Sequence, residues 1–305
     1  MSSAHEVAAV IVTYQPDAVR VGKMLEALKG EVSHAVIVDN ASDELPEHRW
    51  RLQWPTLVLR RLAVNKGVGA AQNEGVAVAA ALGATHVLLL DQDSAPSSGM
   101  VSNLLAATES LARRGLKAGC VGPQRRRPGS AESTGFTQLG WLGVRKLQCD
   151  DSSRPVQCDF VVASGSLVPL SAWHEVGGME EELFIDLVDT EWCLRARSKG
   201  YGVYGAAAVL EHTIGEAGRQ IGVGRQARLP RHKPFRYYYI FRNSFLLARR
   251  PYVPLKFVLF QFRLLAATFF LVGVLGGRWL ELRMMARGMY DGLRGVTGRV
   301  AVAHR

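Results

Sequence analysis

The sequence predicts an α/β protein in which a largely parallel sheet carries helices on both faces, with amphipathic helices added at the C-terminal end. Short β-branched runs alternate with helical patterns in the first half of the chain. Such alternation is typical of parallel sheets, because each crossover between strands covers one face of the sheet with a helix. Polar residues follow several of the runs, at the strand ends where open α/β sheets bind ligands. With 305 residues, 48% of them hydrophobic, the chain is long enough to bury a substantial core.

The expected strands and helices alternate regularly up to residue 123. Apolar, β-branched composition predicts strands within residues 7–14, 34–42, 56–62, 86–90 and 117–123. Helices are expected at the Ala-rich residues 67–83 and at residues 98–115, where a glycine ends the helical pattern.

The middle of the chain has a less regular pattern. Residues 124–160 are rich in Pro, Gly, Ser and Arg, which predicts an irregular loop. After that loop the sequence predicts a strand over 160–163 and a short helix near 171–175. The pair Gly177-Gly178 favours a turn, and a longer helix is expected over Asp189–Lys199. The first residue of that helix is a plausible N-cap, since a carboxylate can accept the free backbone N–H groups there.

Two carboxylates, Asp91 and Asp93, follow the expected strand 86–90 with one residue between them. Asp is disfavoured in strands and common in turns, so one interpretation is a polar turn after a buried strand. The other is a cation site, because carboxylates at i and i+2 past a strand end can both face one hard ion and its phosphate ligand. Thr13-Tyr14 and Asp39-Asn40 also lie at strand ends. This convergence favours the cation site.

Charge divides the chain into two parts. The net charge is +10, yet residues 217–305 carry seventeen Lys and Arg against only Glu281 and Asp291, so the preceding part is mildly acidic. We therefore expect an α/β domain over residues 1–230 and a separate C-terminal segment, 231–305, that meets an anionic partner. The four scattered cysteines match no zinc or redox spacing and favour a reducing compartment.

The C-terminal segment combines aromatic, basic and apolar residues. Its longest uncharged run, Leu264–Gly277, has 14 residues, fewer than the ~20 that a membrane-spanning helix needs. Arg263 and Arg278 bracket the run, which favours helices lying in the membrane interface near anionic lipid head groups. The alternative is an amphipathic helical pair packed on the body. No nucleic-acid partner is expected, because no recognition motif accompanies the basic residues.

Seven stretches resemble inverting glycosyltransferases of family 2, whose GT-A fold is a Rossmann-like sheet covered by helices. In the family's order they are IVTYQP, VDNAS, NKGVGAAQNEG, LLLDQDS, ASGSLVPLSAW, GGMEEELFIDLVDTEWCLRARSKGY and EHTIG. The combination of LLLDQDS, FIDLVDTEWCLRA and EHTIG resembles bacterial rhamnosyltransferases that use dTDP-L-rhamnose. The resemblance implies a GT-A catalytic domain over residues 1–230 and transfer of L-rhamnose, with inversion, from dTDP-β-L-rhamnose to a hydroxyl.

The resemblance assigns Asp91 and Asp93 to the family's D-x-D element, which binds Mg²⁺ or Mn²⁺, with Asp91 also contributing to donor binding. A cation bridging these carboxylates and the diphosphate would stabilise the charge that develops as the nucleoside diphosphate leaves. His212, in EHTIG, is a candidate third metal ligand, since neutral imidazole accompanies carboxylates in some metal sites. A satisfied core or surface histidine is the alternative for His212.

The resemblance also implies that Asp189, in VDTEW, is the catalytic base. The acceptor hydroxyl must lose its proton as it attacks, so a carboxylate is required on the face opposite the leaving group. Asp186 and Glu191 are the local competitors for this role. The alternative for Asp189 is a helix cap alone.

Contacts to the nucleotide are expected from the first two strand ends and from the glycine-rich helix start. Thr13 and Tyr14 are candidates to contact or stack on the base, and Asp39 to accept the N3–H of a thymine or uracil ring. Gly67 would let the backbone approach the nucleotide, and Lys66 would meet a phosphate. A solvated charge is the commoner role of a lysine, and helix packing is the alternative for the glycine.

Several other interpretations remain open from the sequence alone. The donor could be another nucleotide sugar, such as a UDP-sugar, and Trp173 and Trp192 could line the acceptor side or lie in the core. A haloacid dehalogenase-type phosphatase also uses D-x-D, but there the pair follows the first strand. A sugar nucleotidyltransferase or a non-catalytic membrane module fits the pattern less well.

The resemblance and the charge pattern together predict a place in the cell. A soluble dTDP-sugar donor implies a cytoplasmic active site, and the basic segment implies a peripheral enzyme on the inner face of the cytoplasmic (inner) membrane. The expected acceptor is a saccharide or glycolipid, as in lipopolysaccharide and O-antigen assembly or rhamnolipid synthesis.

Overall fold

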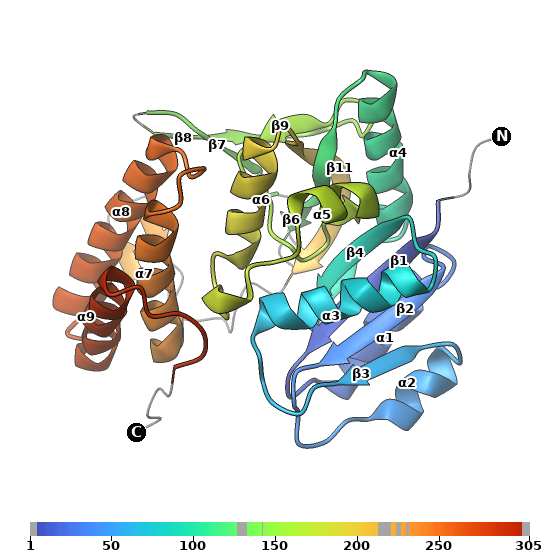
Figure 1. Cartoon of the computed structure of the whole chain (residues 1–305), viewed down its shortest axis with the longest axis horizontal. Coiled ribbons are helices and arrows are strands. Elements are labelled where there is room, and N and C mark those ends of the chain that lie inside the picture. Colours follow the sequence, from blue (N-terminus) through green and yellow to red (C-terminus); the bar gives the residue numbers. More distant parts are fainter. Residues whose placement is uncertain are drawn as a thin grey trace.

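The computed structural model describes residues 5–126, 133–141, 143–212, 221–223, 227–229 and 232–300. A nine-stranded sheet flanked by helices forms the body, and a group of C-terminal helices stands at one end of it (Figure 1). In spatial order the strands are β3 (Val58–Arg61), β2 (His34–Asp39), β1 (Val7–Thr13), β4 (His86–Asp91), β10 (Leu167–Pro169), β6 (Ala118–Arg126), β11 (Gly202–His212) and β5 (Ser94–Pro96), and β9 (Val156–Cys158) pairs with β11.

The predicted alternation of strands and helices is confirmed in the first 126 residues. Strands β3, β2, β1 and β4 are parallel neighbours, as are β6 and β11. The helices of this part are α1 (Ala18–Leu28), α2 (Glu47–Gln53), α3 (Val68–Ala81) and α4 (Met100–Arg113). Strand β10 runs antiparallel between β4 and β6, so the sheet is mostly rather than wholly parallel.

The sheet separates two hydrophobic cores, as expected when helices cover both faces. Successive residues of β1 point to opposite sides, so that Val10 packs in one core with Val76 of α3, and Ile11 packs in the other with Leu104 of α4. Helix α3 lies very close to the sheet. A Cβ at Gly75 would lie 2.3 Å from Val10 Cγ1, so only a glycine permits this approach.

Two expectations for the middle of the chain are wrong. Residues 124–160 are not simply a loop, because β6 continues to Arg126 and a hairpin follows, made of β7 (Phe136–Leu139) and β8 (Val144–Leu147). The side chains of β8 are largely exposed, so no apolar alternation marked it as a strand. The strand expected at 160–163 does not form, since Phe160 makes only an isolated bridge and the next strand is β10.

The two helices expected after this region are confirmed as α5 (Leu170–Val176) and α6 (Val188–Ser198), with the short 3₁₀ helix η1 (Glu181–Leu183) between them. The N-cap of α6 is Leu187, in a left-handed conformation with φ 64°, and not Asp189. Asp189 instead lies in the first turn of the helix.

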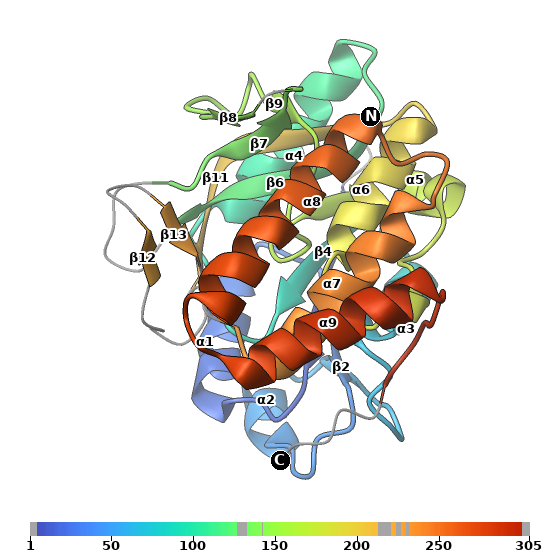
Figure 2. The ribbon, with the colours of Figure 1, turned by 90° about the vertical axis from the view of Figure 1, so that its left-hand side faces the viewer.

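The C-terminal segment folds into α7 (Pro234–Ala248), α8 (Leu255–Thr268), the π-helix η2 (Phe269–Val274) and α9 (Trp279–Leu293). A separate two-stranded hairpin, β12 (Ile221–Val223) with β13 (Ala227–Leu229), precedes them. In Figure 2 α8 and α9 lie in front of α7 and meet at their shared end. Cβ atoms at Gly288 and Gly292 would lie 2.4 Å and 2.7 Å from backbone oxygens of α7, so these glycines let the two helix backbones touch.

Helices α7 and α8 pack against the body, and contact of the segment with a membrane interface stays a prediction. Leu247 on α7 and Phe257 on α8 are 1% and 2% exposed and belong to the same hydrophobic core as Trp192 of α6. On α8, Lys256 Nζ lies 3.0 Å from Asp159 Oδ1, and Arg263 donates a hydrogen bond to the Trp141 carbonyl at 3.3 Å. The alternative of helices packed on the body therefore describes α7 and the inner face of α8.

Helix α8 is longer than the uncharged run in the sequence. With η2 it forms one helix, Leu255–Val274, of 20 residues with a mean hydropathy of 2.0, the one helix in the described part of the chain that is long and apolar enough to cross a membrane. The helix reaches this length by including Lys256 and Arg263. Because both charged side chains contact the body, the contacts favour a helix lying along the protein surface.

Candidate active site

The carboxyl ends of β1, β2 and β4 meet at one edge of the sheet. Thr13 of β1 is in register with Asp39 of β2, and Asp91 of β4 is in register with Val12 of β1. The predicted convergence of polar residues at these strand ends is therefore confirmed. The candidate site is built on this edge.

Three carboxylates gather at the end of β4. Asp91 is the last residue of the strand, and Asp93 lies in the turn that leads to β5. Between them, Gln92 fixes the end of β1, because its Oε1 accepts the Tyr14 N–H at 2.7 Å. The pKa of Asp91 is raised to about 7, first by burial and then by the nearby negative charges of Asp93 and Asp189.

Within this cluster, the chemistry of the Asp91 and Asp93 pair fits a divalent cation. Mg²⁺ and Mn²⁺ prefer oxygen ligands and commonly take some of them from substrate phosphates. A cation held by Asp91 and Asp93 would relieve the repulsion that raises the pKa of Asp91. Among the described residues, no group of three or more His, Cys, Asp or Glu side chains is arranged to hold a metal. Donor phosphates would therefore have to complete the coordination.

His212 ends β11, where its backbone pairs with Ser94 at the start of β5. That register puts residue 212 beside the strand that follows Asp93. The side chain of His212 lies outside the part of the structure that is described. Its role as a metal ligand stays a prediction.

Asp189 is held in place through both of its carboxylate oxygens. Oδ1 accepts the Thr190 N–H at 2.7 Å and Oδ2 accepts the Ala163 N–H at 3.2 Å. Burial raises the pKa of Asp189 and the charge of Asp186 adds to the shift, against the lowering effects of the two hydrogen bonds and of Arg125. A positioned carboxyl group with a raised pKa is suited to accept a proton.

The two competitors for the role of base are already engaged elsewhere. The Glu191 side chain is fully buried, accepts hydrogen bonds from Arg195 at 2.7 Å and 3.0 Å, and accepts the Tyr252 hydroxyl at 2.5 Å. Asp186 accepts hydrogen bonds from the guanidinium of Arg236 at both oxygens. These ion pairs favour Asp189, whose hydrogen-bond donors are neutral backbone N–H groups, over Asp186 and Glu191 as the proton acceptor.

Two arginines that the sequence analysis did not single out lie close to the carboxylates. Arg125, near the end of β6, and Arg236, on α7, both interact electrostatically with Asp91 and Asp189. Guanidinium groups bind phosphate oxygens with two parallel hydrogen bonds, so this pair could meet a diphosphate. Neither had a usable sequence signal, because one lay in an expected loop and the other in the basic C-terminal segment.

Asp39 organises the end of β2 from a fully buried position. It accepts hydrogen bonds from the Thr13 hydroxyl at 3.0 Å and from the Ser42 N–H and hydroxyl at 2.8 Å and 2.5 Å, and Arg61 Nε lies 3.9 Å away. Its exposure is 0%. The predicted contact with a nucleobase would therefore require the Ser42 turn to move. Tyr14, at 47% exposed, is open to a ligand, whereas Thr13 is buried.

The loop before α3 is fixed by Asn40, which the sequence showed only as a turn residue. Its Oδ1 accepts the Lys66 N–H at 2.8 Å and its Nδ2 donates to the Gly67 carbonyl at 3.0 Å. Gly67 has φ 90°, and a Cβ there would lie 2.4 Å from the Phe184 carbonyl oxygen. The close approach predicted for Gly67 is thus made to another loop of the protein. The exposed Lys66 remains free to meet a phosphate.

Residues 182–187, here called the base loop, precede Asp189 and have an unusual backbone. Phe184, Asp186 and Leu187 all have positive φ values, of 65°, 64° and 64°. Each such residue costs on the order of 1 kcal/mol or more, and clusters of them are typical of functional sites. The Phe184 carbonyl also accepts the Val68 N–H at 2.8 Å, which joins the base loop to the start of α3.

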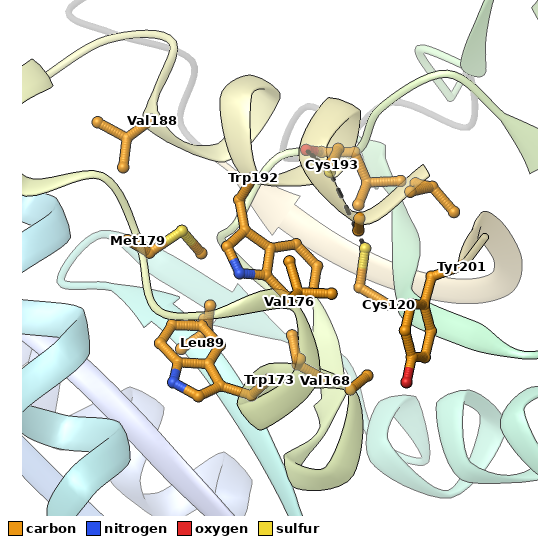
Figure 3. Packing of buried hydrophobic residues seen from close by; sticks show 14 of the residues in the cluster. Leu89, Cys120, Val168, Trp173, Val176, Met179, Val188, Trp192, Cys193 and Tyr201 are labelled. Atoms are coloured by element: carbon orange, nitrogen blue, oxygen red, sulfur yellow. Dashed lines mark hydrogen bonds between the residues drawn. The ribbon is translucent and has the colours of Figure 1, made fainter. Parts of the chain in front are cut away.

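Trp173 and Trp192 belong to the core. They are 7% and 1% exposed, and their rings stack with centroids 5.8 Å apart. Figure 3 shows the two indoles among the other buried side chains of this core. The indole N–H of Trp192 donates to the Gly177 carbonyl at 2.8 Å. They do not line the acceptor side, and the core interpretation is confirmed.

Comparison with known proteins gave matches at the level of sequence and of fold. No family model matches the chain. The chain is 29% identical over 296 residues to the dTDP-rhamnosyl transferase RfbF of Shigella flexneri, covering 95% of this chain and 96% of that protein. Among solved structures it is similar to S. aureus TarS 1-349, with a TM-score of 0.58 at 13% identity, covering 95% of this chain and 81% of that one. The same TarS fragment in complex with UDP-GlcNAc gives a TM-score of 0.56, also at 13% identity and with the same coverage. The predicted GT-A fold is confirmed.

Proposed function

We propose that this protein is a rhamnosyltransferase of the inverting, family 2 type that moves L-rhamnose from dTDP-β-L-rhamnose to a hydroxyl of a saccharide or glycolipid. The observation that carries the proposal is the meeting of Asp91, Asp93 and Asp189 at the carboxyl edge of a GT-A sheet. The choice of donor is supported by the relative named as a dTDP-rhamnosyl transferase, which matches 95% of this chain.

The proposed reaction is a single displacement. The acceptor oxygen forms a bond to C1 of rhamnose as the bond from C1 to the diphosphate oxygen breaks, and the acceptor proton passes to Asp189. Displacement from the opposite face turns a β-linked donor into an α-linked product. Asp189 is supported as the base because both oxygens are held by backbone N–H groups and its local competitors are engaged.

Asp91 and Asp93 would hold the Mg²⁺ or Mn²⁺ that the proposal includes, with His212 as a possible third ligand. When bound, such a cation supplies positive charge for the departing diphosphate. Arg125 and Arg236 would add their charges on the protein side. Tyr14 would stack on the base, with Thr13 and Asp39 shaping the turn beneath it, and Lys66 and Gly67 would border the phosphates.

The donor assignment predicts a clear preference among nucleotide sugars. With membrane extract as acceptor source, we expect nucleotide release from dTDP-L-rhamnose to exceed release from dTDP-glucose or a UDP-sugar by about a hundredfold, because a polar sugar pocket left with unpaired groups rejects the wrong sugar. Product NMR should show an α-linkage. Equal release from dTDP-glucose would refute the donor. Preference for a UDP-sugar would indicate a glycosyltransferase with a different donor. Hydrolysis of p-nitrophenyl phosphate without sugar transfer would indicate a phosphatase.

We also propose that the enzyme binds the inner face of the cytoplasmic membrane peripherally, through an apolar tip where η2 meets α9. The tip consists of Phe270, Val274, Leu275, Trp279 and Leu280, which are 40–77% exposed. Basic side chains of the segment lie on the same helices, among them Arg283 and Arg287. Exposed apolar groups beside arginines suit an interface with anionic lipid.

The membrane proposal predicts salt-sensitive binding that depends on the tip. Full-length protein should co-sediment with phosphatidylglycerol-containing vesicles at low salt and bind less, but still measurably, at 0.5 M salt, since screening weakens only the ionic part. The double change Leu275→Ser and Trp279→Ser should abolish the salt-resistant part. Leu52→Ser on α2, which alters a side chain that is 71% exposed at the other end of the molecule, is the control and should bind normally. No binding at low salt would contradict the proposal.

A further inference from the structure

The base loop, residues 182–187, begins in the last residues of η1 and continues as an irregular segment with a strained backbone. Three of its residues have positive φ values without being glycine. Buried backbone carbonyls need hydrogen-bond partners, and here most of those partners are side chains of α7. Helix α7 lies beside α6 in Figure 1, at the boundary between the sheet domain and the C-terminal helices.

Asn243 supplies most of these hydrogen bonds from a fully buried position. The two N–H groups of its Nδ2 donate to the carbonyls of Leu183 at 3.0 Å, Ile185 at 2.8 Å and Asp186 at 2.8 Å, so that one N–H is shared between two carbonyls. Its Oδ1 accepts from Arg242 Nε at 2.9 Å, which fixes the orientation of the amide. One side chain therefore gathers three carbonyls of the loop around a single nitrogen.

Arg242 completes the arrangement with a fully buried guanidinium. Its Nη2 donates to the carbonyls of Leu183 at 2.9 Å and Glu182 at 3.3 Å, and its Nη1 donates to the Gly298 carbonyl at 2.6 Å. The guanidinium carbon also lies 4.7 Å from the ring centroid of Tyr239. The chain after α9 is thereby tied to the loop, and the Gly298 N–H in turn donates to the Glu182 carbonyl at 2.6 Å.

Two further contacts of the base loop connect the residues bound by Arg242 and Asn243 to the candidate site. Asp186 binds Arg236, and the Phe184 carbonyl accepts the Val68 N–H at the start of α3. Two residues after the loop ends at Leu187, Asp189 presents its carboxylate in the first turn of α6. A shift of the loop would therefore move the proposed base relative to the edge formed by β1, β2 and β4.

We infer that Arg242 and Asn243 are positioning residues that clamp the base loop and so set the place of Asp189 for proton transfer. This inference rests on the proposed transfer reaction and deepens it. Neither clamp residue touches the reacting atoms. An apolar pair of similar size would fill the same space but leave five donor contacts to loop carbonyls unmade, so packing alone does not account for these residues.

The decisive variant is Asn243→Asp, which keeps the shape of the side chain but replaces the donating nitrogen by an oxygen facing three carbonyls. We expect kcat for transfer to fall on the order of a hundredfold, because small misplacements of reacting groups carry costs of this size. The affinity for dTDP, measured by calorimetry, should fall by no more than about tenfold, less than kcat, since only the Asp186–Arg236 contact links the loop to the nucleotide side.

Ser244→Ala is the matched control. Ser244 is the next residue on α7 and is also buried, but its hydroxyl bonds Ile240 and Gln261 rather than the loop. It should lower thermal stability modestly and leave kcat within about twofold. Equal loss of kcat in both variants, or parent-like kcat in Asn243→Asp, would overturn the inference.

Hydrogen exchange tests whether Asn243 holds the base loop, and this test does not depend on the transfer reaction. Peptides covering residues 182–190 should exchange at least about tenfold faster in Asn243→Asp than in Ser244→Ala, with peptides of β1 and β4 unchanged. If the parent transfers no sugar from any donor, the proposed function fails, while this exchange result still decides whether the clamp holds the loop. If Asn243→Asp does not fold, Arg242→Lys is used instead. It keeps a buried cation but loses the planar fork, and unchanged loop exchange in that variant would refute the clamp.

Discussion

Asp189→Asn is expected to lower kcat by about a hundredfold to ten-thousandfold while leaving the affinity for dTDP-rhamnose within about threefold. The amide keeps the shape of the side chain but has no basic oxygen to accept the acceptor's proton. One backbone donor, Ala163 N–H or Thr190 N–H, would then face an amide NH₂, so a stability loss of roughly 1 kcal/mol is also expected. Steady-state kinetics with calorimetry of donor binding measures both effects.

Changes at the neighbouring carboxylates serve as controls for this result. Glu191→Gln should chiefly lower the melting temperature, because it removes the charge from a buried pair with Arg195. Asp186→Asn should weaken the hold on Arg236 and affect donor binding as well as turnover. If Asp189→Asn were as active as the parent and Asp186→Asn were not, the base would be Asp186.

Local sequence patterns were enough to predict the sheet but not the way its second half is completed. Residues such as 7–14 and 86–90 are apolar on both sides of the strand because helices cover both faces of the sheet. A continuous apolar run of this kind can be recognised directly in the sequence. Strand β8 has exposed, charged side chains, and the residues at 160–163 have strand-forming composition but no strand partner. In both places tertiary pairing decided the structure, and local propensity could not reveal it.

The candidate site likewise contains some residues that the sequence could predict and others that it could not. Asp91 and Asp93 were predictable because a carboxylate pair directly after a buried strand is conspicuous, and their position depends only on the strand. Arg125, Arg236 and Asn243 reach the site through contacts between distant elements. No spacing in the sequence signals such contacts.

The charge count of the C-terminal segment overstated its positive surface. Arg242 is fully buried against loop carbonyls, and Arg236 is paired with Asp186, so neither is available to lipid. Lys256 is likewise paired with Asp159. An excess of basic residues predicts an anionic partner only when their side chains reach the surface, and here part of the excess stabilises the site from within.

Asp93→Ala is expected to abolish cation-dependent donor binding and to lower transfer on the order of a thousandfold, because several kcal/mol of charge stabilisation for the diphosphate would be lost. Asp93 lies in a partly exposed turn, so the free energy of unfolding should stay within about 0.5 kcal/mol of the parent. Calorimetry of dTDP binding with Mn²⁺ and with EDTA gives the readout. The parent should bind more tightly by at least about tenfold with Mn²⁺, and the variant should not respond to the metal.

Asp150→Ala is the matched control, since it removes an exposed carboxylate between β8 and β9 and should respond to Mn²⁺ as the parent does. The same measurement tests the alternative that Asp91 and Asp93 form a polar turn and bind no metal. In that case removing the Asp93 charge would relieve its repulsion on Asp91 and on an incoming diphosphate, and the variant would bind dTDP more tightly than the parent even with Mn²⁺ present. The sign of the change in affinity measured with Mn²⁺ therefore decides between a cation site and a polar turn. Weaker, metal-independent binding in the variant supports the cation, and binding tighter than the parent's with undiminished transfer would refute it.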